Sequence, residues 1–313
     1  MATSYTADEL IERVRREARI PNKAATGSQD ADILQHLNDA MDSILVPFIR
    51  RTREEYFALT RRSPIVAGQR RYRIHRRSIG QQIRSVYFIS GDQRLCLTRV
   101  DPGNLDKAGN VGSGNPTAFY LEGNHIVFVQ QPLGGELEVG FYASPGRLVL
   151  ERQTCKVASV NTAAKTITLA TDPPASWEES ATSFDVHSGL SGGELKQVGL
   201  TRADISGTVV TVAEAIDGSV HGTYQPEAGD YLCLEGEAAK PGVPHELQAA
   251  LVQAACSLWH QAQGNLEAAM AIKNTLGEML VGERVTLSSR VESHPPKMVS
   301  YNPLWGSRGR SFF

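Results

Sequence analysis

The sequence predicts an α+β protein with helical ends and a strand-rich middle. Apolar residues recur at helical spacing in the first 64 residues and again after residue 241. Between these segments, short runs of β-branched and aromatic residues are separated by Gly, Pro and Asn, which is the pattern of antiparallel strands. The chain has 313 residues, and a domain contains roughly 100–200, so two domains are expected and three are possible.

The first segment, 1–64, is predicted to supply the N-terminal helices of a bundle. Thr6 and Glu9 have the spacing of a capping box, which starts an amphipathic helix. A longer amphipathic helix follows, and Pro47 should kink it or end its first part, because proline has no amide hydrogen. Residues 48–59 are expected to form a second helical piece.

The second segment, 65–150, is predicted to be an antiparallel β region. It contains several runs rich in Val, Ile, Tyr and Phe, and Gly123-Asn124 between two of them is a hairpin signal. A turn with Pro and two glycines separates this hairpin from the run at 136–143. These three runs are therefore expected to form an antiparallel meander.

The third segment, 151–240, is predicted to be an inserted, small β-rich domain. A hairpin is expected with residues 161–165 in its turn, and further strands at 208–212 and 230–234. The segment has six Lys or Arg side chains against thirteen Asp or Glu, a local net charge of −7. This shift in composition and charge favours a separate domain.

The C-terminal part is predicted to return to helix and then to end in an extended arm. Residues 241–283 contain two helical patterns broken at Gly264-Asn265, and helices joined by so short a turn should pack as an antiparallel pair that completes the bundle. The arm, 284–313, is either disordered or docks on a partner through its aromatic residues, and its density of large aromatics favours docking. The arm residues expected to bind are Tyr301, Trp305, Arg308, Arg310, Phe312 and Phe313.

Composition and motifs argue against most enzyme classes. The net charge is −2, no stretch approaches the about 18 apolar residues of a membrane span, and the N-terminus lacks the apolar region of a secretory signal. The four cysteines are far apart, which argues against a zinc site and predicts reduced, buried thiols. There is no GxSxG, HExxH, Walker or GxGxxG motif in a suitable context. We therefore predict no catalytic residue, no metal site and no cofactor.

The most unusual feature of the sequence is its density of arginine between residues 50 and 99. Thirteen arginines and no lysine stand against three acidic residues, a local net charge of +10. Arginine favours bidentate pairing with carboxylates or phosphates. The segment is either a solvated surface, a protein–protein interface, or a face that touches passing nucleic acid without reading it, and the interface is favoured. The residues proposed as protomer–protomer or channel contacts are Arg50, Arg51, Arg53, Arg61, Arg62, Arg70, Arg71, Arg73, Arg76 and Arg77.

Three stretches of the sequence resemble the head-to-tail adaptor, or connector, proteins of tailed bacteriophages. They are the helical start at 8–59, the helical pair at 245–280, and the terminal YNPLWG…FF beginning at Tyr301. The β block at 151–240 departs from the smallest, all-helical members, so the chain is similar to the larger type that carries a β domain.

The resemblance implies a structural virion protein without enzymatic activity, located in the neck between capsid and tail and made in the host bacterial cytoplasm. It implies a dodecameric ring beneath the portal, with the helices around a channel for the genome and the arm gripping the portal. Its partners would be the portal protein, a tail or nozzle protein, other copies of itself and genomic DNA bound non-specifically, with no membrane.

Two other readings remain open from the residues. One is a tail-associated cell-wall or glycan-binding or degrading protein, in which Trp177 and Tyr224 would stack on sugars. The other is a nucleic-acid binder with a basic face, which predicts a DNA affinity that falls steeply with salt. The absence of any catalytic motif ranks the first behind the structural interpretation, and the absence of a base-reading motif and a net charge of −2 weaken the second.

Overall fold

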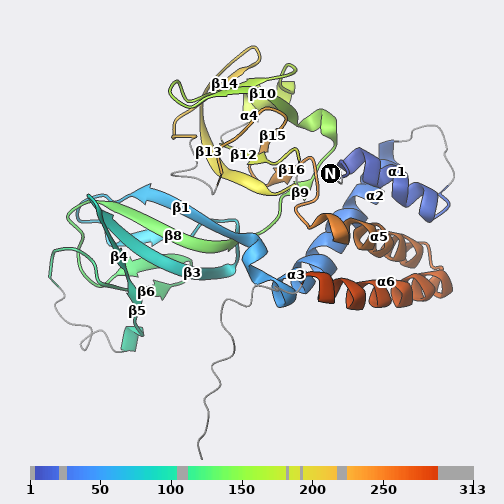
Figure 1. Cartoon of the computed structure of the whole chain (residues 1–313), viewed down its shortest axis with the longest axis horizontal. Helices are drawn as coiled ribbons and strands as arrows, with labels where there is room; N and C mark the ends of the chain where they lie inside the picture. Colours follow the sequence, from blue (N-terminus) through green and yellow to red (C-terminus); the bar gives the residue numbers. More distant parts are fainter. Residues whose placement is uncertain are drawn as a thin grey trace, which may run out of the picture.

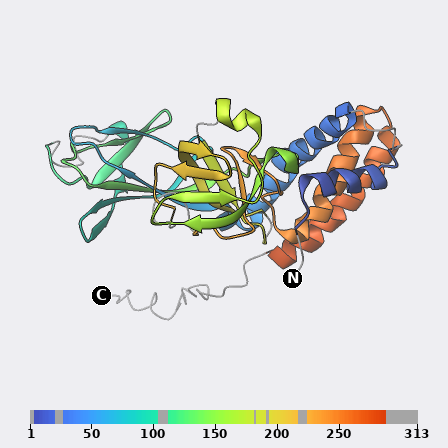
Figure 2. The same ribbon diagram turned by 90° about the horizontal axis from the view of Figure 1, so that it is seen from above.

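The chain folds into three parts, which Figures 1 and 2 show from two directions. A group of helices lies at one end, a two-sheet β sandwich lies at the other, and a closed β barrel lies over the junction between them. The predicted α+β class is confirmed. This computed structural model describes residues 4–20, 27–103, 112–180, 183–190, 193–216 and 224–287.

Helices from both ends of the chain pack around one hydrophobic core. Leu10 and Leu37 from the first helices, and Leu251 from the C-terminal pair, all belong to it and are fully buried. The predicted capping box is confirmed, since the Thr6 amide donates to Glu9 Oε2 at 2.8 Å. The helical elements are α1 (Ala7–Glu17), α2 (Gly27–Ala40), the π-helical η1 (Met41–Leu45), α3 (Val46–Thr52), the 3₁₀ turn η2 (Glu54–Phe57), η5 (His245–Leu247), α5 (Gln248–Ala262) and α6 (Leu266–Leu287).

The irregularity expected at Pro47 is present, but the helix after it is shorter than predicted. The chain passes from α2 through the π-helical turn η1, and Pro47 stands in the first turn of α3, where a missing amide hydrogen costs little. The prediction of helix over 48–59 is wrong at its C-terminal end, because a strand begins at Ala58. Leu59 pairs with Phe141 in that strand, so burial in a sheet overrides the local helical pattern.

The β sandwich consists of two four-stranded sheets around a common core. Its strands are β1 (Ala58–Pro64), β2 (Arg71–Arg73), β3 (Ser78–Ser90), β4 (Gln93–Cys96), β5 (Thr98–Arg99), β6 (Ala118–Glu122), β7 (His125–Phe128) and β8 (Glu136–Ala143). One sheet has the order β1-β8-β3-β4 and the other β2-β7-β6-β5. The hairpin predicted at Gly123-Asn124 joins β6 to β7 and is confirmed.

The predicted meander of β6, β7 and β8 is wrong, because β7 and β8 belong to different sheets. Gly134 and Gly135 both have positive φ in the segment that crosses from one sheet to the other. Phe128 at the end of β7 and Leu137 at the start of β8 then meet in the core between the sheets. Burial of both apolar faces therefore wins over the short-range pairing that the sequence suggested.

The barrel is closed by six antiparallel strands in the order β10-β11-β14-β13-β12-β15. Its strands are β10 (Cys155–Asn161), β11 (Thr166–Leu169), β12 (Ser183–His187), β13 (Leu195–Ser206), β14 (Val209–Val212) and β15 (Tyr231–Leu234). The hairpin predicted with its turn at 161–165 joins β10 to β11 and is confirmed. A short helix, α4 (Ala175–Ser180), places Trp177 in the barrel core, with its ring 5.1 Å from that of Phe184.

The chain enters and leaves the barrel through two short parallel strands, β9 (Arg147–Leu148) and β16 (Glu237–Ala238). Asn38 of α2 fixes this pair to the helices, since its side chain accepts from the Leu148 amide at 2.7 Å and donates to the Leu148 carbonyl at 3.1 Å. Past this point, α5 and α6 run side by side in opposite directions, as predicted for helices joined by a tight turn (Figure 1).

Candidate functional site

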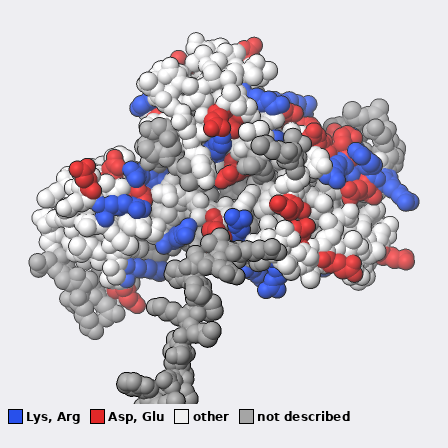
Figure 3. Space-filling model, viewed as in Figure 1, with Lys and Arg blue, Asp and Glu red and all other residues white. Residues whose placement is uncertain are grey.

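The arginine-rich segment, residues 50–99, runs from α3 to β5, and the ten arginines predicted as contacts lie between α3 and the turn before β3. Figure 3 shows Lys and Arg in several separate patches on the visible face. Some of the arginines make contacts within the chain and others are exposed. The structure therefore divides the predicted set into arginines with partners in the chain and arginines open to solvent.

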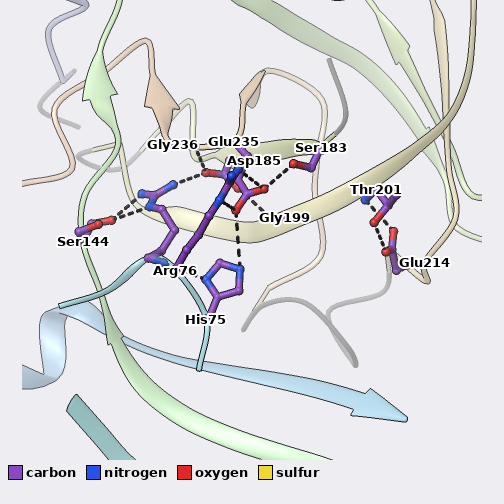
Figure 4. Close-up of polar contacts among 11 residues, drawn as sticks. His75, Arg76, Ser144, Ser183, Asp185, Gly199, Thr201, Glu214, Glu235 and Gly236 are labelled. Atoms are coloured by element: carbon purple, nitrogen blue, oxygen red, sulfur yellow. Dashed lines mark hydrogen bonds and ion pairs between the residues drawn. The ribbon is translucent and has the colours of Figure 1, made fainter. Parts of the chain in front are cut away.

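Arg77 joins the sandwich to the barrel through a buried ion pair with Asp185 of β12. The side chain of Arg77 is 7% exposed and that of Asp185 is fully buried. Arg77 also donates to the Ser144 carbonyl, while Asp185 accepts from the amides of Gly199 and Gly236 at 2.8 Å each (Figure 4). Both charged groups of this pair are therefore hydrogen-bonded. Such hydrogen bonds offset the cost of removing the two charges from water.

A second contact between sandwich and barrel lies beside the first. Arg76 pairs with Glu235, at 2.5 Å between Arg76 Nη2 and Glu235 Oε2, and Ser183 donates to the same carboxylate (Figure 4). Burial raises the pKa of Glu235, but the hydrogen bonds from Arg76 and Ser183 outweigh it and leave the pKa below its usual value. His75 Nε2 lies 3.8 Å from Glu235, and burial, together with the neighbouring Arg61, lowers the pKa of His75 to about 4.

Two further arginines form ion pairs on the outer face of the sandwich. Arg62 and Arg94 hold the two oxygens of Glu138, with Arg62 Nε at 2.8 Å and Arg94 Nη2 at 2.5 Å. Arg94 also stacks over the ring of Tyr87 at 3.8 Å. Arg70 donates to the carbonyls of Phe128 and Val129 at the end of β7. All of these contacts join residues of the sandwich to one another and stabilise it.

The remaining arginines of the predicted set are more open. Arg50 bonds to Gln82, Arg53 lies 3.4 Å from Glu55, and Arg71 lies 3.9 Å from Glu122. The side chains of Arg51 and Arg73 are exposed and make no hydrogen bond or ion pair with any described residue. Arg61 is half-buried and likewise has no such partner among the described residues. Contact of these arginines with another chain or with DNA stays a prediction.

The sequence reasoning did not name the acidic partners of the arginines, Asp185, Glu235 and Glu138. A signal for the first two was present, because they belong to the acidic segment 151–240, whose charge is opposite to that of the arginine segment. Charge alone does not identify which carboxylates meet which arginines, since most acidic residues are solvated. Their spacing in sequence, 108 residues between Arg77 and Asp185, hides the contact.

Several other predicted features have a clear position. Trp177 is 1% exposed inside the barrel, so it cannot stack on a sugar at the surface, whereas Tyr224 is 51% exposed. Cys155, Cys233 and Cys256 are buried free thiols as predicted, but Cys96 is exposed on the edge strand β4, which corrects that expectation. The proposed portal-binding residues Tyr301, Trp305, Arg308, Arg310, Phe312 and Phe313 lie outside the described residues.

Two other kinds of site are absent from the described ranges. No group of three or more His, Cys, Asp or Glu side chains there could hold a metal ion. In that same part of the chain, no helix combines the length and the apolar character that crossing a bilayer requires. What stands out in the described part is the set of arginine contacts that joins sandwich to barrel.

Comparison with known proteins identifies the family to which this architecture belongs. A family model described as SU10 adaptor protein matches residues 5–176, more than half of the chain. The match takes in the N-terminal helices, the whole sandwich and the first two strands of the barrel. A search of curated proteins finds no match. The resemblance seen in the sequence is therefore confirmed, and the chain belongs to the SU10 adaptor protein family, a family of structural, generally non-enzymatic bacteriophage adaptors.

Proposed function

We propose that this protein is a head-to-tail adaptor that assembles as a ring of identical copies between the portal and the tail, with the genome passing through the ring. The observation that carries the proposal is the family match over residues 5–176. A dodecamer is the stoichiometry that we expect, and the portal protein, a tail or nozzle protein and DNA held non-specifically are the proposed partners. The site of action is the virion neck.

The outer face of α6 supports a contact between copies. Leu266, Met270 and Val281 are 61%, 69% and 72% exposed, and their spacing places them on one side of the helix. Ala269 and Leu276 are buried on another side of the same helix. A ring needs a face that docks on a different face of the next copy, and exposed apolar side chains gathered on one helix are typical of such an interface.

The exposed arginines are proposed as the second group of contacts. Arg51 lies on α3 and Arg71 on β2, and both point to solvent in the single chain. We propose that they meet the neighbouring copy or the DNA in the channel. Arg77 and Arg70 already donate hydrogen bonds within the chain, so we propose that they stabilise the fold and do not contact a partner.

The C-terminal arm is proposed to bind the portal. The arm was expected to begin at residue 284, but α6 continues to Leu287, which corrects that boundary. The rest of the predicted arm, 288–313, carries Tyr301, Trp305, Phe312 and Phe313, with Arg308 and Arg310 between them. Large aromatic side chains supply much of the binding energy at protein interfaces. Removal of 288–313 should therefore abolish portal binding and leave the thermal unfolding of the remaining chain unchanged.

The test of the proposal is native mass spectrometry of the purified chain, alone and mixed with its portal protein, together with negative-stain imaging. We expect a ring on the portal, with one discrete stoichiometry. A chain that stays a monomer or dimer and ignores the portal would contradict the proposal.

Two charge-changing variants locate the contacts in the same assay. Met270→Glu combined with Val281→Glu should prevent ring formation, and Leu133→Glu is the matched control because Leu133 is equally exposed (70%) but lies on the sandwich. Arg51→Glu with Arg71→Glu should weaken assembly, with Arg99→Glu as its control. A ring that forms normally with the α6 variant would contradict that assignment.

A further inference from the structure

One arginine of the sandwich occupies a position where an apolar residue is expected. In β1, Leu59, Arg61 and Ser63 share one face, and they pair with Phe141, Val139 and Leu137 of β8. Leu137 belongs to the core of the sandwich, and Leu59 and Phe141 pack against Val198 of the barrel. Arg61 therefore lies on the inner face of the sheet, between two hydrophobic clusters.

A cleft opens at this position within the sandwich, between β1 and β8 on one side and the end of β2 with the residues after it on the other. Leu137, Val139 and Phe141 form its apolar wall, and Arg61, Arg73 and His75 supply its polar groups. The ring of His75 lies 5.4 Å from that of Phe141, so it covers part of this wall. Ser63 and Ile74 complete the lining of this cleft.

The guanidinium of Arg61 has no counter-charge in contact with it. Its Nε is buried without a hydrogen-bond partner, and no ion pair joins the side chain to any residue that the structure describes. Burial lowers the pKa of Arg61, while Glu235, Glu214 and Asp185 act from a distance in the opposite sense. A half-buried cation without a direct partner is costly for the free chain.

The surrounding charges leave this side of the cleft positive. Glu235 is held by Arg76 and Ser183, Asp185 by Arg77, and Glu214 by the amide and hydroxyl of Thr201. Arg73 also lines the cleft, and its side chain is exposed and unpaired among the described residues. Two arginines, Arg61 and Arg73, thus face one cleft with no carboxylate committed to either.

We propose that this cleft is a binding site for a carboxylate, supplied by an acidic side chain in a segment of a partner protein. The planar guanidinium of Arg61 suits bidentate binding of a carboxylate, and the apolar wall suits the methylene groups that carry it. A duplex presents its phosphates on a broad convex surface, whereas a peptide inserts single side chains into a narrow cleft. The site follows from this chain alone, and only the identity of the partner as a virion protein rests on the proposed function.

The stability of the free chain gives the first test. Arg61→Met keeps the volume of the side chain and removes the unpaired charge, so it should unfold at the same temperature as the wild type or higher. Arg62→Met is the matched control, because Arg62 is the next residue, faces the other side of the sheet and is paired with Glu138. It should lower the unfolding temperature. An Arg61→Met variant that is clearly less stable than Arg62→Met would show that Arg61 is a structural residue and would overturn the proposal.

Binding to the purified full chain gives the second test. A fluorescein-labelled glutamate oligopeptide is titrated in an anisotropy assay, beside a glutamine oligopeptide of the same length and a short DNA duplex. We expect binding of the glutamate peptide only, weakened about tenfold or more by Arg61→Met and also reduced by Arg73→Met, as for loss of a charged hydrogen bond. Arg62→Met should bind as the wild type does.

Two results of the binding test would overturn the proposal. One is DNA binding that depends on Arg61 while the glutamate peptide does not bind. The other is glutamate binding that all three variants share with the wild type. Because the assay needs neither portal nor ring, a failure here leaves the adaptor proposal untouched, and a failure to form rings leaves the carboxylate site untouched.

Discussion

The sandwich and the barrel each bury a carboxylate, and they neutralise it in different ways. Glu138 of the sandwich is 4% exposed and is held by two arginines of the same sandwich, Arg62 and Arg94. Asp185 of the barrel is fully buried, and its counter-charge, Arg77, comes from the turn before β3 in the sandwich. The buried carboxylate of the sandwich is therefore neutralised within the sandwich, whereas that of the barrel depends on an arginine of the sandwich.

This difference shows how the barrel is held in place. The barrel has a closed hydrogen-bonded perimeter and a hydrophobic core of its own, so we expect it to fold without the sandwich strands. Its orientation relative to the rest of the chain depends on the ion pairs of Arg76 and Arg77 and on the parallel pair of β9 with β16. In a ring adaptor, such a junction would fix where the barrel points.

The largest expected effect tests whether the barrel core is independent. Trp177→Ala should lower the free energy of unfolding by about 4 kcal/mol, because it leaves a large cavity beside Phe184 in the core of the barrel. Hydrogen exchange should show faster opening of β12 and β13 and unchanged protection of β3 and β8. Tyr224→Ala, at an exposed position, is the control and should change stability by less than about 0.5 kcal/mol. Equal loss of protection in the sandwich would show that the two regions fold as one unit.

The second prediction breaks the junction itself. Arg77→Met leaves Asp185 buried with only backbone amides as partners, and it should cost about 3 kcal/mol in urea denaturation. The double variant Arg77→Met with Asp185→Asn should recover part of this loss, since the unpaired charge is gone. Arg76→Ala, in which the arginine side chain is 61% exposed, is the comparison and should cost about 1 kcal/mol or less. A cost below about 1 kcal/mol for Arg77→Met would mean that the pair is dispensable.

Local patterns in the sequence predict much of the fold. The capping box at Thr6, the hairpins at Gly123 and at residues 161–165, and the tight turn at Gly264 each depend on a few neighbouring residues, and the structure has all four. The errors lie where distant segments compete with local ones. The strand that begins at Ala58 forms because it pairs with β8, which lies about eighty residues further along the chain. No periodicity within 48–59 indicates this partner.

The same reasoning explains what could be inferred about the site. The density of arginine was visible in the sequence, but the different positions of Arg61 and Arg62 were not. These two residues are adjacent and chemically identical, and the strand β1 sends one to the inner face and the other to Glu138 on the outer face. Only the register of β1 with β8 distinguishes an unpaired arginine in a cleft from one that is part of an ion-pair network.

A third prediction uses pH to compare the junction with the rest of the protein. Burial lowers the pKa of His75 to about 4 in the folded chain, whereas the unfolded value is about 6.5. The stability due to neutral His75 is therefore complete above pH 6.5 and is lost as the pH falls toward 4, because the unfolded state takes up the proton first. Between pH 7 and 4.5 the loss should be up to about 2 kcal/mol.

The control for this pH dependence is His75→Phe, which keeps the ring against Phe141. Its stability should fall less between pH 7 and 4.5 than that of the wild type, as measured by urea denaturation at each pH. Buried His187 also has a lowered pKa, caused first by burial, so part of the slope should remain. Identical pH profiles of stability for the wild type and His75→Phe would contradict the lowered pKa of His75 in the folded chain.

The smallest expected effect tests whether either arginine alone is enough to neutralise Glu138 within the sandwich. Arg62→Met should cost only about 1 kcal/mol, because Arg94 still holds Glu138. Arg94→Met should be similarly mild, but the double variant removes both counter-charges from a carboxylate that is 4% exposed and should cost about 3 kcal/mol, more than the sum of the single changes. Urea denaturation of the four proteins gives this double-mutant cycle. If the costs of the two single variants add up to the cost of the double variant, the two arginines act independently. Glu138 would then have no reserve counter-charge, and the sandwich would not differ in this respect from the barrel with its single ion pair.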